Sequence, residues 1–267
     1  MQRISLKGPP MQAGSVTAEW ASPYEVLRRK WGTIPCGHTR IESRDLLQLG
    51  DRELLAAWDR AYHGLSTGPN FGLGGWYHDL YRAELSGRKV LDLGCGMAVS
   101  SLHFAEHGAR VVFADIVEDN VRVVERLCAL KGIAGEFLYI EDQRSFAQLP
   151  DDFDTVLAIG SLINAPTEVI REEVQALLPH LKPGCRWLHF AYPKARWVRE
   201  GMPPFSQWGE ITDGPGTPWM EYHEWETLVH LFSPTPIELV FGCEWHDHDF
   251  NWFDFRVHAA TGAPAVG

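Results

Sequence analysis

The sequence predicts an α/β fold with a mostly parallel sheet, and three observations support this fold class. From Lys89 onwards, short apolar runs alternate with amphipathic stretches of helical period. Strands that alternate with helices form right-handed crossovers, which give a parallel sheet covered on both faces. The first apolar run leads into the Gly-rich turn Gly94-Cys95-Gly96. The last two runs are joined by only four polar residues, which is typical of an antiparallel hairpin.

The individual elements follow from this alternation. We expect strands at 90–93, 111–114, 137–140, 155–159 and 187–191, and helices at 97–107, 118–131 and 167–178. A further helix is expected at about 222–232, and the hairpin comprises 237–245 and 250–259. The predicted core is therefore residues 76–260. It is interrupted at about 193–221 by a Pro-, Gly- and Trp-rich insertion that we expect to cap the substrate.

The segment before the first strand has a different character. Residues 1–20 are expected to be a disordered tail, because they contain several Gly, Pro and Gln residues. Residues 21–75 predict short helices, the first starting at Ser22 and Pro23, followed by the Gly-rich stretch 64–75. We interpret this region as a helical lid with a Gly-rich hinge.

Composition excludes several classes of protein. The formal charge is −11, which argues against a nucleic-acid partner. Five Cys residues without a CxxC pair fit a reduced cytoplasmic protein that has neither disulfides nor a zinc cluster. No apolar run approaches the ~20 residues of a membrane span, and the N-terminal residues do not read as a signal peptide. We expect a cytoplasmic monomer or homodimer that binds no membrane.

The turn after the first strand has the features of a nucleotide-cofactor site. Gly94 and Gly96 allow a ligand to approach the backbone, and the following helix offers free N–H groups. Asp115 ends the second strand about 20 residues on, where it would bind a ribose hydroxyl. Asp92 lies inside the turn. A carboxylate there would repel a pyrophosphate and suits a cationic amino group, and Val99 stands where a third dinucleotide Gly would fall.

On these residues, the chain from about Tyr77 to Ala259 resembles the class I S-adenosylmethionine-dependent methyltransferases. The resemblance implies a Rossmann-like seven-stranded sheet of order 3-2-1-4-5-7-6 with strand 7 antiparallel, and S-adenosyl-L-methionine as the cofactor. Ala98 departs from the family, in which many members have a third Gly. The residues that the resemblance and the expected lid assign to the cofactor are Asp92, Gly94, Cys95, Gly96, Asp115, Ile116, Asp142, Gln143, Gly160, Ser161, Trp76 and Tyr77. Asp142 would contact the adenine amino group, and Trp76 and Tyr77 would border the sulfonium.

A general base is needed only for some acceptors, because a thiolate or neutral amine reacts without one. The candidates for a hydroxyl acceptor are Tyr192 at the end of the fifth strand, His223, and His246 in the hairpin turn with its neighbour His248. No metal is expected. Neighbouring ligands in the turn 246–249 do not close a coordination shell. Gly160 and Ser161 also stand where metal-dependent relatives have an acid.

The expected function is methylation of a small molecule, most simply on oxygen, in an enclosed aromatic-lined pocket. Trp197, Trp208, Trp219 and Trp225 would roof this pocket, and Lys194, Arg196 and Arg199 would neutralise an anionic group of the acceptor. Three alternatives stay open at this point. They are an N-methyltransferase of a small amine, an NAD-dependent oxidoreductase, and a non-catalytic cofactor-binding accessory subunit.

Overall fold

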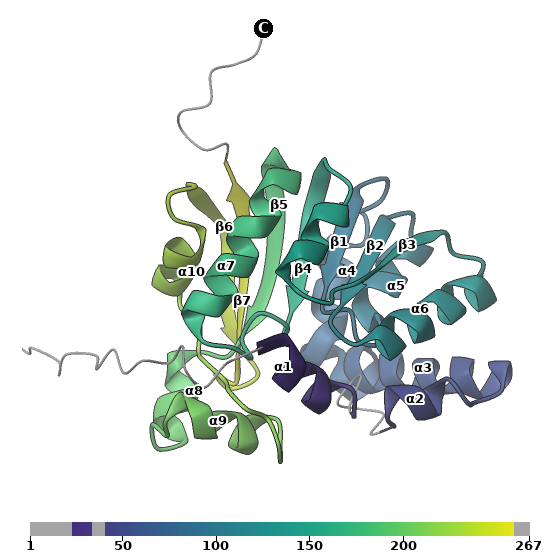
Figure 1. Ribbon diagram of the computed structural model, residues 1–267, viewed down its shortest axis with the longest axis horizontal. Helices are drawn as coiled ribbons and strands as arrows, with labels where there is room; N and C mark the ends of the chain where they lie inside the picture. The colour runs from purple at the N-terminus through teal and green to yellow at the C-terminus, as the bar shows by residue number, and fades with distance from the viewer. Residues whose placement is uncertain (1–22, 34–40, 259–267) are drawn as a thin grey trace, which may run out of the picture.

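Seven strands form one sheet in the order β3-β2-β1-β4-β5-β7-β6 (Figure 1), as the resemblance predicts. This computed structural model describes residues 23–33 and 41–258. Strand β7 pairs antiparallel with β5 and β6, and the other neighbouring pairs are parallel. The strands are β1 (Lys89–Leu93), β2 (Arg110–Asp115), β3 (Gly135–Tyr139), β4 (Phe153–Ile159), β5 (Leu181–Ala191), β6 (Ile237–Trp245) and β7 (Phe250–Val257).

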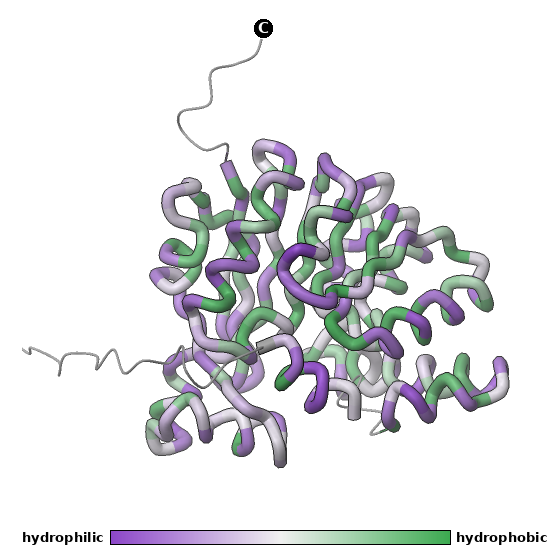
Figure 2. The backbone as a smooth tube through the Cα atoms, viewed as in Figure 1, coloured by the Kyte–Doolittle hydropathy of each residue, from purple (hydrophilic) through white to green (hydrophobic). Residues whose placement is uncertain are grey.

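Helices cover both faces of the sheet, because the central strands are apolar on both sides. On β5, for example, Trp187 packs into one hydrophobic cluster and Leu188 into the other. One face is covered by α7 (Thr167–Leu177) and α10 (Trp225–Phe232), and the other by α3 (Asp51–Ser66), α4 (Trp76–Tyr81), α5 (Val99–Glu106) and α6 (Glu118–Lys131). Figure 2 shows hydrophobic and hydrophilic residues interleaved along the helices, as expected for elements with one buried side.

Within the N-terminal region, α1 (Pro23–Trp31) lines a cavity at the carboxyl edge of the sheet, whereas the rest of the expected lid and hinge, as far as the structure describes it, packs on the core. Helices α2 (Ser43–Leu46) and α3 pack against α5 and α6, where Leu54 and Trp58 join the core. The stretch 64–75 is not a loop, because it continues as helical turns η2 (Gly68–Asn70) and η3 (Phe71–Gly75) into α4. A Cβ on Gly75 would lie 2.2 Å from the Ser66 carbonyl oxygen, so this stretch requires glycine for close packing. Ser22 and the expected tail lie outside the described residues.

Three short helices gather at the carboxyl edge of the parallel strands. Helix α1 (Pro23–Trp31) lies at this edge beside α8 (Lys194–Arg199) and α9 (Phe205–Thr212), which belong to the insertion after β5 (Figure 1). Open α/β sheets bind ligands at this edge. The remaining short elements are the 3₁₀ turns η4 (Gln143–Gln148) and η5 (Leu178–His180). Within the described ranges, no helix is both long and apolar enough to cross a membrane.

Four histidines are buried among the described residues: His78, His103, His189 and His223. Burial lowers the pKa of His78 and His223 to about 3 and that of His103 to about 4. Burial and the neighbouring His223 also hold the pKa of His189 well below its ordinary value. These imidazoles are therefore neutral in the folded protein at a pH where the unfolded chain protonates them.

This difference predicts that acid destabilises the protein. Below pH 6.5 the unfolded chain binds more protons than the folded one, so the free energy of unfolding falls as the pH falls. Each such histidine contributes about 1.4 kcal/mol per pH unit. Replacing buried His78 by Gln removes one contribution, so unfolding in urea at several values between pH 7.5 and pH 5 gives a shallower slope. The exposed His230 on α10 serves as the matched control, and an unchanged slope in His78→Gln would contradict the prediction.

Candidate active site

A cavity lies between α1 and the carboxyl ends of β1, β2 and β4. Tyr24, Leu27 and Trp31 form the wall contributed by α1. The rest of the wall follows the strands and the segments after them: Leu93, Gly94, Gly96, Asp115, Ile116, Asn120, Ile140, Phe146, Ile159, Gly160, Ser161, Leu162, Asn164 and Glu173. One wall of the cavity therefore comes from a helix that is distant in sequence from most of the other lining residues.

The turn after β1 is held by neighbouring strands. The Gly94 and Cys95 N–H groups donate to the Ala114 carbonyl at 2.8 and 3.1 Å. Gly94 has φ +76°, and a Cβ there would lie 2.5 Å from the Cβ of Ser161 at the end of β4. The turn ends at Ala98 with φ 51°, a left-handed conformation that costs a non-glycine residue about 1–2 kcal/mol. The turn therefore forms with Ala98 in the place where many relatives have glycine.

Asp115 fixes the far side of the same turn. Its carboxylate accepts hydrogen bonds from the N–H groups of Gly96 and Val117, each at 2.8 Å. Asn120 also bonds to this carboxylate, and Ser43 of α2 donates to the Asn120 side chain. Burial nevertheless raises the pKa of Asp115 above its ordinary value. The carboxylate is thus oriented by the backbone before any ligand binds.

The charged residues of the cavity wall are acidic. Asp115 and Glu173 line the cavity, and the lining residues include no Lys, Arg or His. Burial raises the pKa of Glu173 to about 7. A wall of this kind attracts a cationic ligand and repels a pyrophosphate.

Half of the residues assigned to the cofactor lie in the cavity wall. These are Gly94, Gly96, Asp115, Ile116, Gly160 and Ser161. The other six are Asp92, Cys95, Asp142, Gln143, Trp76 and Tyr77, and they do not line this cavity. Cys95 is buried and contributes its backbone N–H to the turn, while burial raises the pKa of its thiol.

Asp92 is buried behind the turn. Its carboxylate accepts a hydrogen bond from the Ser101 hydroxyl, and burial raises its pKa to about 7. The predicted contact between Asp92 and a ligand amino group stays a prediction. The charge of Asp115, which lines the cavity, contributes to the raised pKa of Asp92.

The remaining four residues have other partners. Asp142 caps η4 through the Arg144 N–H and pairs with the Arg144 guanidinium, while the Gln143 side chain donates to the Glu172 carbonyl at 2.8 Å. Tyr77 stacks on Trp252 at 4.7 Å between ring centroids, and Trp76 contacts Trp245 and Trp252. Trp76 and Tyr77 therefore do not line the cavity, and their expected position beside the sulfonium stays a prediction.

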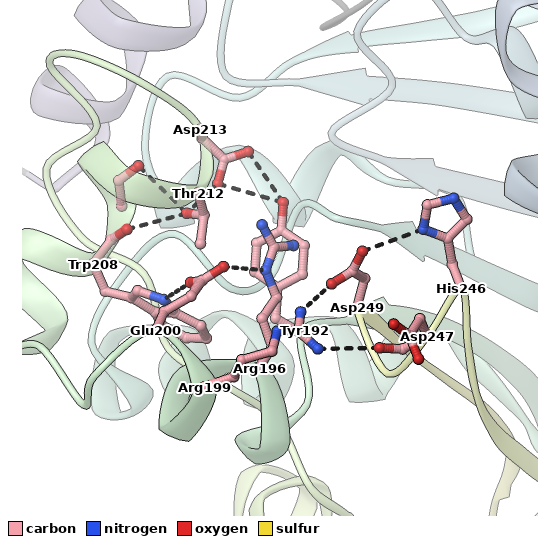
Figure 3. Close-up of polar contacts among 11 residues, drawn as sticks. Tyr192, Arg196, Arg199, Glu200, Trp208, Thr212, Asp213, His246, Asp247 and Asp249 are labelled. Carbon is pink, nitrogen blue, oxygen red and sulfur yellow. Dashed lines mark hydrogen bonds and ion pairs between the residues drawn. The ribbon is translucent and has the colours of Figure 1, made fainter.

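The three candidate bases lie in different environments. His223 is fully buried, and its Nδ1 lies 3.0 Å from Nε2 of His189, so it belongs to the core. His246 is exposed in the hairpin turn and pairs with Asp249. Tyr192 is 8% exposed at the end of β5, and its hydroxyl donates to Asp213 (Figure 3). Of the three, Tyr192 is the one that combines burial and a carboxylate partner with a position at the carboxyl end of β5.

The tryptophans and basic residues that were expected to roof the pocket do not line this cavity. Trp208 is fully buried in the core, and Trp225 packs on Phe253 and Phe255. The lining residues do not include Trp197 or Trp219, and the aromatic wall consists of Tyr24, Trp31 and Phe146. Arg196 pairs with Glu200 and Arg199 with Asp249 (Figure 3), and Lys194 is exposed.

Polar atoms in the wall fit a polar ligand. Ser161 Oγ and Asn164 Oδ1 are buried without a hydrogen-bond partner, and both residues line the cavity. Buried polar groups are normally hydrogen-bonded, so these atoms point to a ligand with donors and acceptors. An adenosyl and methionyl cofactor has hydroxyl, amino and carboxylate groups as well as a sulfonium cation, and therefore fits the wall. Among the described residues, no group of three or more His, Cys, Asp or Glu is arranged to hold a metal ion.

Comparisons with known proteins agree with this fit. A family model described as a methyltransferase domain matches residues 90–184. The ubiquinone biosynthesis O-methyltransferase of Pseudomonas fluorescens (strain SBW25) is 32% identical over 105 residues, which are 39% of this chain and 44% of that protein. The corresponding enzyme of Pseudomonas aeruginosa (strain UCBPP-PA14) is 34% identical over 34% of this chain and 40% of that protein. The chain thus spans less than half the length of these curated relatives.

Solved structures show the same fold. Magnesium protoporphyrin IX methyltransferase from Synechocystis PCC 6803 with bound SAH is 18% identical, with a TM-score of 0.57, over 88% of this chain and 99% of that one. The mitomycin 7-O-methyltransferase is 15% identical, with a TM-score of 0.54, over 89% and 69%. With its strand order and its Gly94–Gly96 turn, the chain has the fold of the class I S-adenosylmethionine-dependent methyltransferases, and its residues 90–184 match a methyltransferase domain.

Proposed function

We propose that the protein transfers the methyl group of S-adenosylmethionine to a hydroxyl group of a small molecule. The observation that carries the proposal is the cavity wall, which has two carboxylates, no basic side chain, and buried polar atoms of Ser161 and Asn164 that have no hydrogen-bond partner. The cofactor supplies an activated methyl group on a sulfonium cation. The chain binds the cofactor on the Gly94–Gly96 turn and orients it through Asp115, which also favours its positive charge. The same wall disfavours the alternative of an NAD-dependent oxidoreductase.

The enclosed position of the site supports a small acceptor. Helix α1 covers the cavity, and α8 and α9 occupy the edge of the sheet beside it (Figure 1). Methyl transfer requires in-line approach of the acceptor and exclusion of water, which such covering segments provide. Both Pseudomonas relatives are ubiquinone biosynthesis O-methyltransferases, which also favours transfer to oxygen. Acceptance of a small amine remains the nearest alternative, because an amine fits the same cavity and needs no base.

The proposal is tested by incubating the full chain with methyl-labelled S-adenosylmethionine and a panel of small phenols, catechols and amines. We expect label in the ether products of hydroxyl acceptors. Label in the amines alone would favour an N-methyltransferase. Tight binding of S-adenosylhomocysteine without any product would favour an accessory subunit, and binding of NADH in its place would contradict the proposal.

Gly94 provides a sharper test of the cofactor turn. Adding a methyl group at Gly94 places it 2.5 Å from Ser161 Cβ, whereas Gly87 has the same φ of +76° with nothing within 4 Å of its Cβ. Both Ala variants bear the conformational cost of positive φ, but only Gly94→Ala overpacks the turn, at about 1–3 kcal/mol. We expect calorimetry to show about tenfold or weaker binding of S-adenosylhomocysteine by Gly94→Ala and little change in Gly87→Ala. Equal affinities in both variants would argue against a close approach at this turn.

We further propose that α1 is the mobile cover of the cofactor. Arg28 anchors it at the β3 side, where the guanidinium donates to Tyr139 Oη at 2.6 Å and to the Glu141 carbonyl at 2.9 Å. Lys30 anchors it at the insertion, where its ammonium donates to the Pro215 carbonyl at 2.8 Å. The helix thus bridges the two sides of the cavity, and its release would open a path for the cofactor.

Removing the Arg28 anchor should speed release of the cofactor product. Hydrogen bonds of charged groups contribute about 1.5–3 kcal/mol, so we expect S-adenosylhomocysteine to leave Arg28→Ala about tenfold faster. Stopped-flow tryptophan fluorescence measures this rate, since Trp31 lines the cavity. Arg29 is the matched control, because its side chain is exposed and pairs only loosely with Glu25 at 3.8 Å. Identical release rates in the two variants would refute the covering role of α1.

A further inference from the structure

A tyrosine and an aspartate form a polar pair at the insertion side of the active site. Tyr192 Oη lies 3.2 Å from Asp213 Oδ1 and 3.5 Å from Oδ2. The Thr212 hydroxyl donates to Asp213 Oδ2 at 2.7 Å, which fixes the carboxylate from the other side. In Figure 3 the phenol points at the carboxylate, and the Arg196 guanidinium lies over the tyrosine ring, 4.2 Å from its centroid.

The pair adjoins the cavity through two separate elements. Tyr192 packs in one hydrophobic cluster with Ile163, which stands between the cavity-lining residues Leu162 and Asn164. On the opposite side, Lys30 of α1 donates to the backbone carbonyls of Asp213 and Pro215. Lys30 neighbours Trp31, which lines the cavity. Tyr192 and Asp213 do not line the cavity themselves, and the pair lies beside it, between Ile163 after β4 and Lys30 of α1.

We propose that Tyr192 and Asp213 form a two-step proton relay for a hydroxyl acceptor, in which Tyr192 is the catalytic residue and Asp213 its positioning and proton-accepting partner. This inference rests on the proposed methyl transfer and adds the group that makes it an oxygen methylation. The phenol donates its own proton to Asp213, and its oxygen accepts a hydrogen bond from Arg196. The second lone pair of Tyr192 Oη remains to accept a hydrogen bond from the acceptor.

The bonds and charges of this step balance. The acceptor oxygen forms a bond to the methyl carbon as the carbon–sulfur bond breaks, and the electron pair of that bond stays on sulfur. The acceptor proton moves to Tyr192 Oη, while the phenol proton moves to Asp213. One positive charge on the methyl donor and one negative charge on Asp213 are lost together. A step that removes both charges is favoured where water is excluded.

The charges around Asp213 are suited to this role. Burial raises the pKa of Asp213, which increases its affinity for a proton, while the hydrogen bonds from Thr212 and Tyr192 and the charges of Arg196 and Lys30 oppose the shift. The charge of Arg196 is itself partly balanced by Glu200 and Asp249. Burial and the neighbouring carboxylate raise the pKa of Tyr192, so the phenol stays protonated until it transfers its proton.

The relay is tested by Asp213→Asn and Tyr192→Phe, with the exposed Glu210→Gln on α9 as matched control. The two acceptors are catechol, which is protonated at neutral pH, and 4-nitrocatechol, whose hydroxyl is ionised there. Removing a general base costs about 100-fold or more. We therefore expect both relay variants to lose that factor in kcat on catechol and to retain most activity on 4-nitrocatechol. The acidic limb of the catechol pH profile should disappear in Asp213→Asn.

A second readout is independent of turnover. In protein with ¹³C-labelled aspartate carboxyls, the resonance that Asp213→Asn removes identifies Asp213. Tyr192→Phe deletes a hydrogen bond that lowers its pKa, so this carboxyl should titrate at higher pH in that variant. An unchanged titration would overturn the pairing whatever the enzyme methylates. Equal losses on both acceptors would overturn the relay alone, and no methylation by the wild-type protein would overturn the proposed function together with the relay.

Discussion

The site depends on one contact between neighbouring strands: the Asp115 carboxylate at the end of β2 binds the Gly96 N–H in the turn after β1 at 2.8 Å. This bond and the hydrogen bonds from Gly94 and Cys95 to Ala114 hold the turn against the sheet. Gly94 can then approach Ser161 at the end of β4, because it has no side chain. The ends of the neighbouring strands β2, β1 and β4 thereby meet at the Gly94–Gly96 turn. The residues at these ends form one side of the cavity.

The charge of the site follows from the same arrangement. A buried carboxylate is costly, and the backbone N–H groups that orient Asp115 offset only part of that cost, since its pKa remains raised. Glu173 and Asp92 have raised pKa values for the same reason. A cationic ligand would stabilise the ionised form of these buried carboxylates, and this attraction would strengthen its binding. In the proposed function, the acids Asp115 and Glu173 would favour a sulfonium donor, because no basic side chain lines the cavity with them.

Local sequence patterns predicted the parts of this structure that depend on neighbouring residues. The strands were predicted because each is a short apolar run, and Gly94, Gly96 and Asp115 were found because they sit at fixed places beside strand ends. The glycines at 64–75 were interpreted as a hinge, but Gly75 is needed for close packing against Ser66. That contact depends on how two helical segments meet, which composition does not reveal.

The missed residues belong to contacts between distant segments. Arg28 binds Tyr139, 111 residues away, and this contact brings Tyr24, Leu27 and Trp31 over the cavity. The sequence around α1 does not indicate that this helix packs against the end of β3 and beside the cavity. Glu173 lies on α7 in a helical pattern that reads as an ordinary surface position. His223, in contrast, was a reasonable candidate base by its place in the sequence, and its burial beside His189 removes it from the site.

The most direct measurement of the central claim is isothermal titration of the full chain with S-adenosylmethionine and, separately, with NADH. The acidic cavity wall predicts one-to-one binding of S-adenosylmethionine and no detectable heat with NADH. Binding of NADH in preference to S-adenosylmethionine would contradict the claim that buried carboxylates favour the sulfonium cofactor.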